Sequence, residues 1–324
     1  MSNNIHVSMG GVFTVSRYSL DADGNPTPKI WLNTTNNMIL DSGLAAIANI
    51  DSFMDYVHLG SGITTPNPLQ TALANKLVAT RGNRRVGDTY SVNVAGDLTN
   101  PYHRITRTYR VEPSGIDQTY TEIGVGWNTE MLFSRSLLKN SSGVNESIFI
   151  PAGDYVEIVY QLTVYIPAGE TVTVITPTGN PSDDITVTIK AAGVTDIPKE
   201  TSGTGLWCLH GAYEYNVSTI TTYSLLHVSN SYFSFGSGPI SNTIADYPYT
   251  TYNGDKKIWV DYEGGNSATF RIWSYPNENT GSIRCAIVSV GFFSFQVEFN
   301  PPIDKGVNDE LFIYFTLSWG RVIE

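Results

Sequence analysis

The chain has 324 residues, enough for one large or two medium-sized domains with a substantial core. Charged residues make up only 15% of it, apolar residues 41% and aromatic residues 12%, and this composition excludes an intrinsically disordered chain. The net charge of −11 argues against nucleic acid as the primary partner, because affinity for the phosphate backbone comes from clustered Lys and Arg. No stretch reaches 18 consecutive apolar residues, so we expect no membrane insertion.

The first quarter of the chain carries turn and helix signals. Residues 1–8 lack the pattern of a secretory signal, so we expect synthesis in a cytoplasm. Asp21–Pro26 faintly resembles a calcium loop but lacks its closing Glu, and we predict a turn instead. Asp41 and Ser42 are typical helix caps and predict a short helix through Ile47. A second short helix is predicted over Leu69–Val78, after two prolines, and we expect both helices to pack on a sheet.

Strand patterns dominate the rest of the chain. Tyr155–Ile166 is rich in β-branched and aromatic residues and lies between two Pro-Ala-Gly turns, which predicts a strand. The same pattern recurs in seven further segments, so the predicted fold is mainly β, with antiparallel sandwiches and one or two short helices near the N-terminus. These segments are Glu170–Thr176, Asp184–Ile189, Lys257–Tyr262, Thr269–Tyr275, Ile283–Val290, Phe292–Phe299 and Leu311–Trp319.

Turn-rich stretches suggest two regions. The turn at Pro167–Gly169 and the polar, Pro- and Gly-bearing stretch Ala191–Gly205 are typical of boundaries. We therefore expect residues 1–168 to form an N-terminal β domain that contains the short helices. Residues 169–324 are expected to form a second β-rich region, in which 283–324 pack on the first domain.

Motifs for catalysis or cofactor binding are missing from the sequence. The five histidines show neither an HExxH nor an HxH pattern, and Cys208 with His210 supplies only two of the ligands that a metal needs. Cys208 and Cys285 are interpreted as reduced, buried thiols. The nucleophile elbow, the P-loop and the dinucleotide-binding pattern do not occur. We expect no enzymatic activity, no metal and no cofactor.

Four residues keep a glycan-binding alternative open. Asp261 and Glu263 would share a strand face about 7 Å apart, within the separation that glycoside hydrolysis uses. Two glycines follow at once, which favours a solvent-exposed strand end over a catalytic pair. Trp259 and Trp273 have rings that can stack on a sugar, although aromatic residues at strand spacing more often lie in a core or an interface. With the two carboxylates they are the candidate glycan-binding residues of a receptor-binding module.

The order of several short motifs resembles structural proteins of tailed-bacteriophage virions. One motif contains Gly-Ser-Gly-Ile-Thr-Thr-Pro, another reads Thr-Glu-Ile-Gly-Val-Gly and is followed by Leu-Phe-Ser-Arg. The resemblance covers about the first 166 residues and the last 40, and residues from about 170 to 270 match nothing. The motifs lie at Asn37–Ala48, Val57–Leu73, Thr121–Gly126, Leu132–Arg135, Phe299–Lys305 and Phe315–Arg321.

The resemblance implies a protein without turnover that is assembled around a phage tail, collar or appendage. It would be made in the host bacterial cytoplasm, located in the virion tail, and associated with copies of itself and with other tail or collar proteins. Under the alternative, a tail fibre or spike module, the partner is a host surface glycan. The low charge and abundant aromatic residues fit large subunit interfaces. Composition suggests as interface residues Tyr213, Tyr215, Tyr223, Phe233 and Phe235.

The motifs that carry the resemblance consist of residues that serve folding. Gly60 and Gly62 allow a tight turn out of a strand, and Thr64–Pro66 is expected to start the second helix. Arg135 is expected to hold a carboxylate such as Glu122 between strands. The shared residues therefore predict a scaffold and not a reaction centre.

Overall fold

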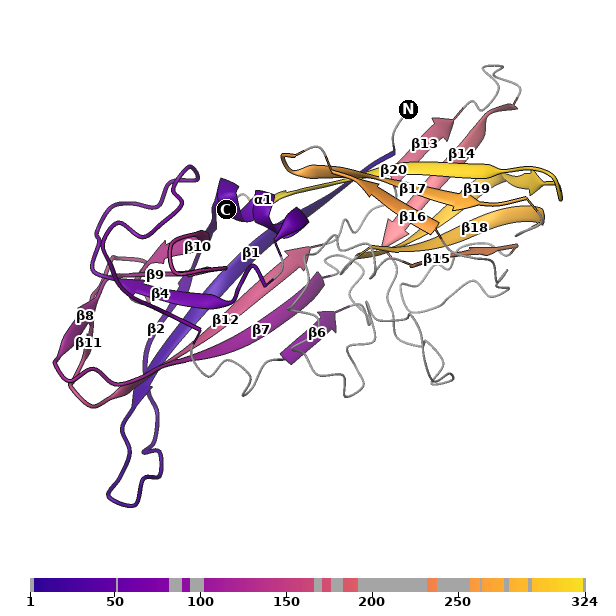
Figure 1. Cartoon of the computed structure of the whole chain (residues 1–324). Helices are drawn as coiled ribbons and strands as arrows, with labels where there is room; N and C mark the ends of the chain where they lie inside the picture. The colour runs from indigo at the N-terminus through magenta and orange to yellow at the C-terminus, as the bar shows by residue number, and fades with distance from the viewer. Residues whose placement is uncertain are drawn as a thin grey trace.

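The long strand β1 (Asn3–Tyr18) lies in the middle of the largest sheet of the computed structural model (Figure 1). The structure describes residues 3–50, 52–81, 89–93, 102–165, 171–175, 183–191, 232–237, 257–262, 264–276, 280–290 and 293–322. Within these residues the regular structure is almost all strand, with a single helix, α1 (Asp41–Asn49). That helix is too short to cross a membrane, and no longer apolar helix occurs among the described residues. The mainly β, largely antiparallel fold predicted from the sequence is confirmed.

The largest sheet has eight strands in the order β16-β17-β20-β1-β12-β7-β6, with β2 also paired to β1. β1 pairs antiparallel with β12 over Ser8–Tyr18 and parallel with β20 over Asn3–Met9. This sheet therefore contains strands from the beginning, the middle and the end of the chain. Its other strands are β2 (Ile30–Asn36), β6 (Thr89–Asn93), β7 (Tyr102–Val111), β12 (Tyr155–Tyr165), β16 (Lys257–Asp261), β17 (Ser267–Ser274) and β20 (Leu311–Arg321).

Two five-stranded antiparallel sheets accompany the large one. The first has the order β3-β10-β9-β4-β5, and the second has the order β13-β14-β19-β18-β15. A short pair, β8 (Gln118–Tyr120) with β11 (Ile148–Ile150), completes the strands of the described residues. The bounds are β3 (Met38–Ile39), β4 (Tyr56–Gly60), β5 (Lys76–Thr80), β9 (Glu122–Gly126), β10 (Leu132–Leu137), β13 (Thr171–Ile175), β14 (Ile185–Ala191), β15 (Tyr232–Gly236), β18 (Gly281–Val290) and β19 (Phe293–Lys305).

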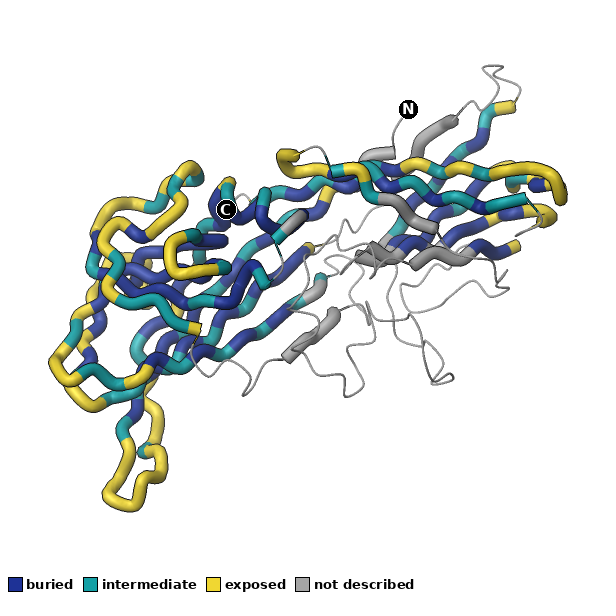
Figure 2. The backbone as a smooth tube through the Cα atoms, viewed as in Figure 1, coloured by how far each residue is buried: buried dark blue, intermediate teal, exposed yellow. Residues whose placement is uncertain are grey.

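The core follows the alternation of the strands. In β12, Val156, Ile158, Tyr160, Leu162 and Val164 are buried, while most of the residues between them are partly exposed. The ring of Tyr160 lies 4.7 Å from a ring of β1, between ring centroids, so neighbouring strands of the large sheet pack their aromatic residues together. Figure 2 shows that the buried residues follow the sheets and that the exposed ones gather in the connections.

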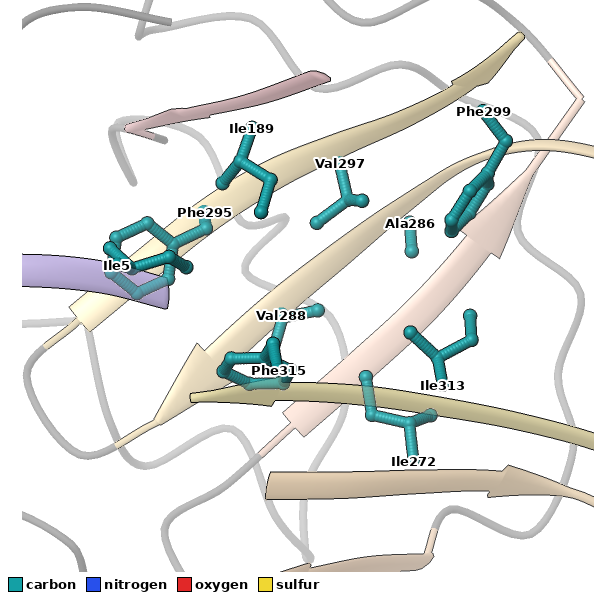
Figure 3. Close-up of a pocket in the computed structure, with 10 residues that line it drawn as sticks. All are labelled: Ile5, Ile189, Ile272, Ala286, Val288, Phe295, Val297, Phe299, Ile313 and Phe315. Carbon is teal, nitrogen blue, oxygen red and sulfur yellow. The ribbon is translucent and has the colours of Figure 1, made fainter. Parts of the chain in front are cut away.

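The space between the large sheet and the sheet of β13, β14, β15, β18 and β19 is apolar. Ile5, Ile272 and Phe315 of the large sheet face Val288 and Phe295 of the sheet that contains β18 and β19 (Figure 3). The gap between them has a volume of about 10 Å³ and an almost entirely apolar lining. A space of this size is no larger than one water molecule, and apolar cavities stay dry. We therefore interpret it as a small packing defect of the core and not as a ligand site.

The described parts of the eight predicted strand segments all overlap observed strands, and the predicted turn at Asp21 is also confirmed. The Asp21 carboxylate accepts hydrogen bonds from the amides of Asp23 (3.0 Å) and Asn25 (2.8 Å). Gly24 has a φ of 81°, a conformation that glycine adopts without strain. The expected division into residues 1–168 and 169–324, with 283–324 on the first domain, stays a prediction.

Of the two predicted helices, only the first forms. α1 begins at Asp41, but its N-cap is Leu40, which makes no side-chain cap, and the Ser42 hydroxyl donates to the carbonyl oxygen of Leu132 (3.0 Å). The prediction of a helix over Leu69–Val78 is wrong, because residues 61–75 form a loop and β5 begins at Lys76. Backbone groups of this loop bind distant residues, and these contacts override the local Leu and Ala pattern.

Candidate protein-interaction site

A buried ion pair joins β9 to β10. The side chains of Glu122 and Arg135 both have 0% relative exposure, and Oε2 of Glu122 lies 2.7 Å from Nη2 of Arg135. Nε of Arg135 donates a second hydrogen bond to the same oxygen at 3.0 Å. The ladder between the strands pairs Arg135 with Gly124, two residues after Glu122, so the ion pair runs diagonally across adjacent strands. The predicted contact between these two side chains is confirmed.

The Glu122 carboxylate also binds both ends of the loop formed by residues 61–75. It accepts hydrogen bonds from the amides of Gly62 (2.8 Å), Ala74 (3.0 Å) and Asn75 (2.7 Å). Burial by itself raises the pKa of this carboxyl group. The three amides and Arg135 act in the opposite direction and together hold the pKa below its usual value, so the group is charged at neutral pH.

Arg135 fixes the middle of the same loop. Its Nη2 donates to the carbonyl oxygen of Thr64 (2.8 Å), and its Nη1 donates to Oε1 of Gln70 (2.5 Å). Oε1 of Gln70 also accepts a hydrogen bond from the Asn67 amide (2.8 Å). We call Glu122 with Arg135 the clamp, and residues 61–75 the clamped loop. The clamp holds a segment without regular structure at five backbone or side-chain positions.

Two glycines make room for the clamp. A Cβ atom on Gly62 would lie 2.4 Å from Oε1 of Glu122, and one on Gly60 would lie 2.6 Å from the same oxygen. Both distances are far below a normal contact, so any other residue would displace the carboxylate. The motifs Gly-Ser-Gly, Glu-Ile-Gly and Leu-Phe-Ser-Arg, which are separate in the sequence, therefore meet in this one cluster.

The clamped loop presents apolar side chains to solvent. Ile63 and Leu69 are each 79% exposed, the highest values among the large apolar side chains of the described residues. Residues 61–75 contain no Asp, Glu, Lys, Arg or His. We call Ile63, Leu69 and the uncharged loop around them the loop patch. Two exposed apolar side chains on one ordered loop make residues 61–75 a candidate for contact with another protein.

Sequence reasoning missed the loop patch because it assigned Leu69–Val78 to a helix. A helix there would have turned Leu69 toward a sheet. The signal that was present is the long uncharged run with two prolines, Pro66 and Pro68, which is typical of a loop. Gln70 was also missed, since nothing in its local sequence indicates a buried guanidinium 65 positions away.

The interface residues suggested by composition receive no support as a group. Tyr213, Tyr215 and Tyr223 lie outside the described residues. Phe233 belongs to β15, and its side chain also lies outside the described part. Phe235, in the same strand, is only 2% exposed and belongs to the apolar core. Its side chain packs within the chain, so it is not available on the surface of the monomer.

The structure brings the two tryptophan positions of the glycan alternative together. In the ladder between β16 and β17, Trp273 pairs with Lys257 and Trp259 pairs with Arg271, so the tryptophans occupy diagonal positions on adjacent strands. Asp261 is exposed at the end of β16, whereas Glu263 lies outside the described residues. The carboxylate pair therefore stays a prediction.

Aromatic side chains surround Trp273 on the outer side of the large sheet. Its ring stacks on Phe312 with centroids 5.5 Å apart and planes at 12°, and it lies 3.9 Å from the ring of Tyr275. Phe312 is 41% exposed, and Tyr314, two residues along β20, is 48% exposed. We call these four residues the aromatic face.

The described residues contain one free cysteine and no cluster of metal ligands. Cys285 is a free, buried thiol, as predicted, and burial raises its pKa to about 11, while Cys208 lies outside the described residues. Within the described part of the chain, no three His, Cys, Asp or Glu side chains lie close enough to hold a metal ion. Comparisons with family models, with curated proteins and with solved structures found no match to this chain.

Removal of one charge from the clamp should destabilise the fold strongly. In Glu122→Gln the guanidinium of Arg135 stays buried without its carboxylate, and such losses cost about 3–5 kcal/mol. We expect the free energy of unfolding in urea to fall by that amount. The matched control is Arg284→Gln, which breaks the partly exposed pair with Glu298 and should cost less than about 1 kcal/mol. Equal losses in the two variants would contradict the structural role of the clamp.

Buried His58 should make the fold sensitive to acid. It is 1% exposed, its Nε2 donates to the carbonyl oxygen of Asn128 (2.9 Å), and burial lowers its pKa from 6.5 to about 4. Between pH 6.5 and about pH 4, His58 binds a proton in the unfolded chain but not in the folded chain. Stability should therefore fall as the pH drops from 6.5 toward 4, by up to about 3 kcal/mol.

Urea unfolding at a series of pH values measures this effect. The variant His58→Gln keeps a donor for Asn128 and has no imidazole, so its stability should change less between pH 6.5 and 5 than that of the wild type. Parallel pH profiles for the two proteins would show that other groups cause the acid sensitivity.

Proposed function

We propose that this chain is a structural protein of a tailed-bacteriophage virion, a tail component that acts by self-assembly and by contacts with other virion proteins. A tube, sheath, collar or appendage-anchoring role fits this description. The observation that carries the proposal is the loop patch, which the clamp fixes in place. Enzymatic turnover has no part in it.

The clamp links the sequence resemblance to this function. The glycines, Glu122 and Arg135 belong to the motifs that resemble virion structural proteins, and they meet in one buried cluster. This cluster holds a surface loop in a single conformation. A loop that is already ordered loses little conformational entropy when a partner binds, which favours stable association.

The net negative charge of the chain favours assembly through uncharged, apolar surfaces. Each chain carries a net charge of −11, so charged surfaces of two copies repel each other. Contacts between copies are then most favourable where charge is absent, as in the loop patch. Exposed ion pairs contribute little to such contacts.

Sedimentation velocity of the purified full-length protein tests the proposal. We expect a discrete oligomer whose size changes little between about 0.1 M and about 1 M NaCl, because this range shortens the screening length without weakening apolar contacts. Class averages from electron microscopy should show a closed, symmetric assembly. A protein that sediments as a monomer at every concentration would contradict self-assembly.

The aromatic face supports a second candidate function, a carbohydrate-binding module of a tail fibre or spike. Trp273, Tyr275, Phe312 and Tyr314 form an aromatic surface on a sheet, with Arg271 beside them in the ladder. Flat aromatic rings with polar neighbours suit the apolar faces and hydroxyl groups of sugars.

Binding to an array of bacterial surface polysaccharides tests this second function. If the aromatic face binds glycans, Trp273→Ala should lower the affinity at least about tenfold, while Trp31→Ala, at an exposed tryptophan of β2, should leave it unchanged. Binding that survives Trp273→Ala, or that is lost equally in both variants, argues against the aromatic face as the site.

A further inference from the structure

We infer that the helix α1 is a conformational coupler between the end of β20 and the clamped loop. β20 stabilises the helix, and the helix stabilises residues 67–73 of the loop, so the order of these residues depends on the last strand of the chain. Figure 1 shows α1 close to the C-terminal end of the chain. The inference goes beyond the proposed function, because it concerns a conformational equilibrium within one chain and holds for any partner.

α1 is a helix that needs support from other elements. It has nine residues, and no side chain caps its N-terminus. Isolated helices shorter than about 12–15 residues are only marginally stable in water, so contacts with the rest of the chain decide whether this segment is helical. Each contact that binds the helical form shifts the equilibrium toward the helix.

The end of β20 supplies three of these contacts. The buried indole of Trp319 donates from Nε1 to the carbonyl oxygen of Leu44 (2.7 Å). Nε of Arg321 donates to the carbonyl oxygen of Ile39 (2.9 Å), just before the helix, and Nη2 of Arg321 forms an ion pair with Asp41. One strand thus holds the beginning of the helix at three points.

The beginning of α1 also contacts the clamped loop. The amide of Asp41 donates to the carbonyl oxygen of Pro68 (2.9 Å). Leu40, the N-cap residue, forms an apolar cluster with Leu73 of the loop and with Leu132, and their exposed fractions are 0%, 7% and 0%. A main-chain hydrogen bond and an apolar cluster therefore join the loop to the residues that β20 holds.

Leu132 adds an indirect connection between the helix and the loop. The Ser42 hydroxyl of α1 donates to the carbonyl oxygen of Leu132 (3.0 Å), and the amide of Leu132 donates to the carbonyl oxygen of Thr71 (2.8 Å). A shift of α1 therefore acts on the loop at Pro68, Thr71 and Leu73.

The clamp and α1 hold different parts of the loop. Glu122 binds the amides of Gly62, Ala74 and Asn75, at the two ends of the loop. Loss of the contacts with α1 should therefore loosen residues 67–73 and leave the ends in place. Thermodynamic linkage makes the coupling reciprocal, so a partner that orders residues 67–73 also stabilises the end of β20 by the same free energy.

Hydrogen exchange of the full-length protein, measured by mass spectrometry, tests the inference. Arg321→Ala removes the ion pair and one hydrogen bond of the helix, and we expect the amides of α1 and of residues 67–73 to exchange at least about threefold faster. The amides that Glu122 binds should exchange as in the wild type. Trp319→Phe, which removes the indole donor and keeps an aromatic ring, should have the same effect on the same segments.

The matched control is Arg17→Ala. It breaks the ion pair with Asp154 at the other end of β1, where Arg17 is 23% exposed, compared with 31% for Arg321. This variant should leave the exchange of α1 and of residues 67–73 unchanged, because neither segment contacts that pair through the contacts described above.

A change in the loop tests the reciprocal effect. Leu73→Ala shortens a side chain of the apolar cluster, and it should speed exchange at the end of β20 at least about twofold. The amides to follow are those of Trp319 and Val322, which donate to the carbonyl oxygens of Asn266 and Met9 (both 2.8 Å).

Three results overturn the inference. The first is faster exchange in α1 alone, since the helix then does not transmit the change to the loop. The second is an equal increase in all strands, which would indicate a general loss of stability. The third is an unchanged end of β20 in Leu73→Ala, because linkage requires the effect to run in both directions.

Discussion

The conformation of the clamped loop depends on one buried ion pair. Glu122 and Arg135 are fully shielded from water, and the removal of two charges from water is so costly that such a pair adds little net stability. Its contribution is selectivity, because another position of the clamped loop would remove the amides and the carbonyl oxygen that complete the hydrogen bonding of the buried pair. The pair thus determines which conformation the loop adopts. This explains why a segment with neither helix nor strand can still be ordered.

Local patterns were sufficient to predict eight strand segments and the first helix, but β1, the central strand of the large sheet, was not among them. Tyr155–Ile166 and the segments like it carry a two-residue alternation that survives in any sheet, since it requires only one buried face. The Leu69–Val78 segment has an equally clear local pattern, yet it forms a loop and a strand. Its backbone amides are bound by Glu122, a residue about 50 positions away, and no property of the local sequence encodes that contact.

Part of the candidate site was also accessible from the sequence. The contact between Glu122 and Arg135 could be predicted because two oppositely charged residues lie 13 positions apart in adjacent strand patterns. The exposed Ile63 and Leu69 could not be predicted, since apolar residues are normally assigned to the core and exposure depends on the whole fold. The aromatic interface residues were chosen from composition alone, which does not distinguish a buried ring such as Phe235 from an exposed one such as Tyr314.

The parallel pairing of β1 with β20 has a consequence for the order in which the large sheet is completed. Residues 3–9 obtain their partner on one edge only when residues 315–321 are available. During synthesis, the large sheet therefore stays incomplete until β20 has left the ribosome. A chain that stops early lacks that strand and leaves an edge of β1 exposed. The exposed edge makes such a chain prone to pair with strands of other chains.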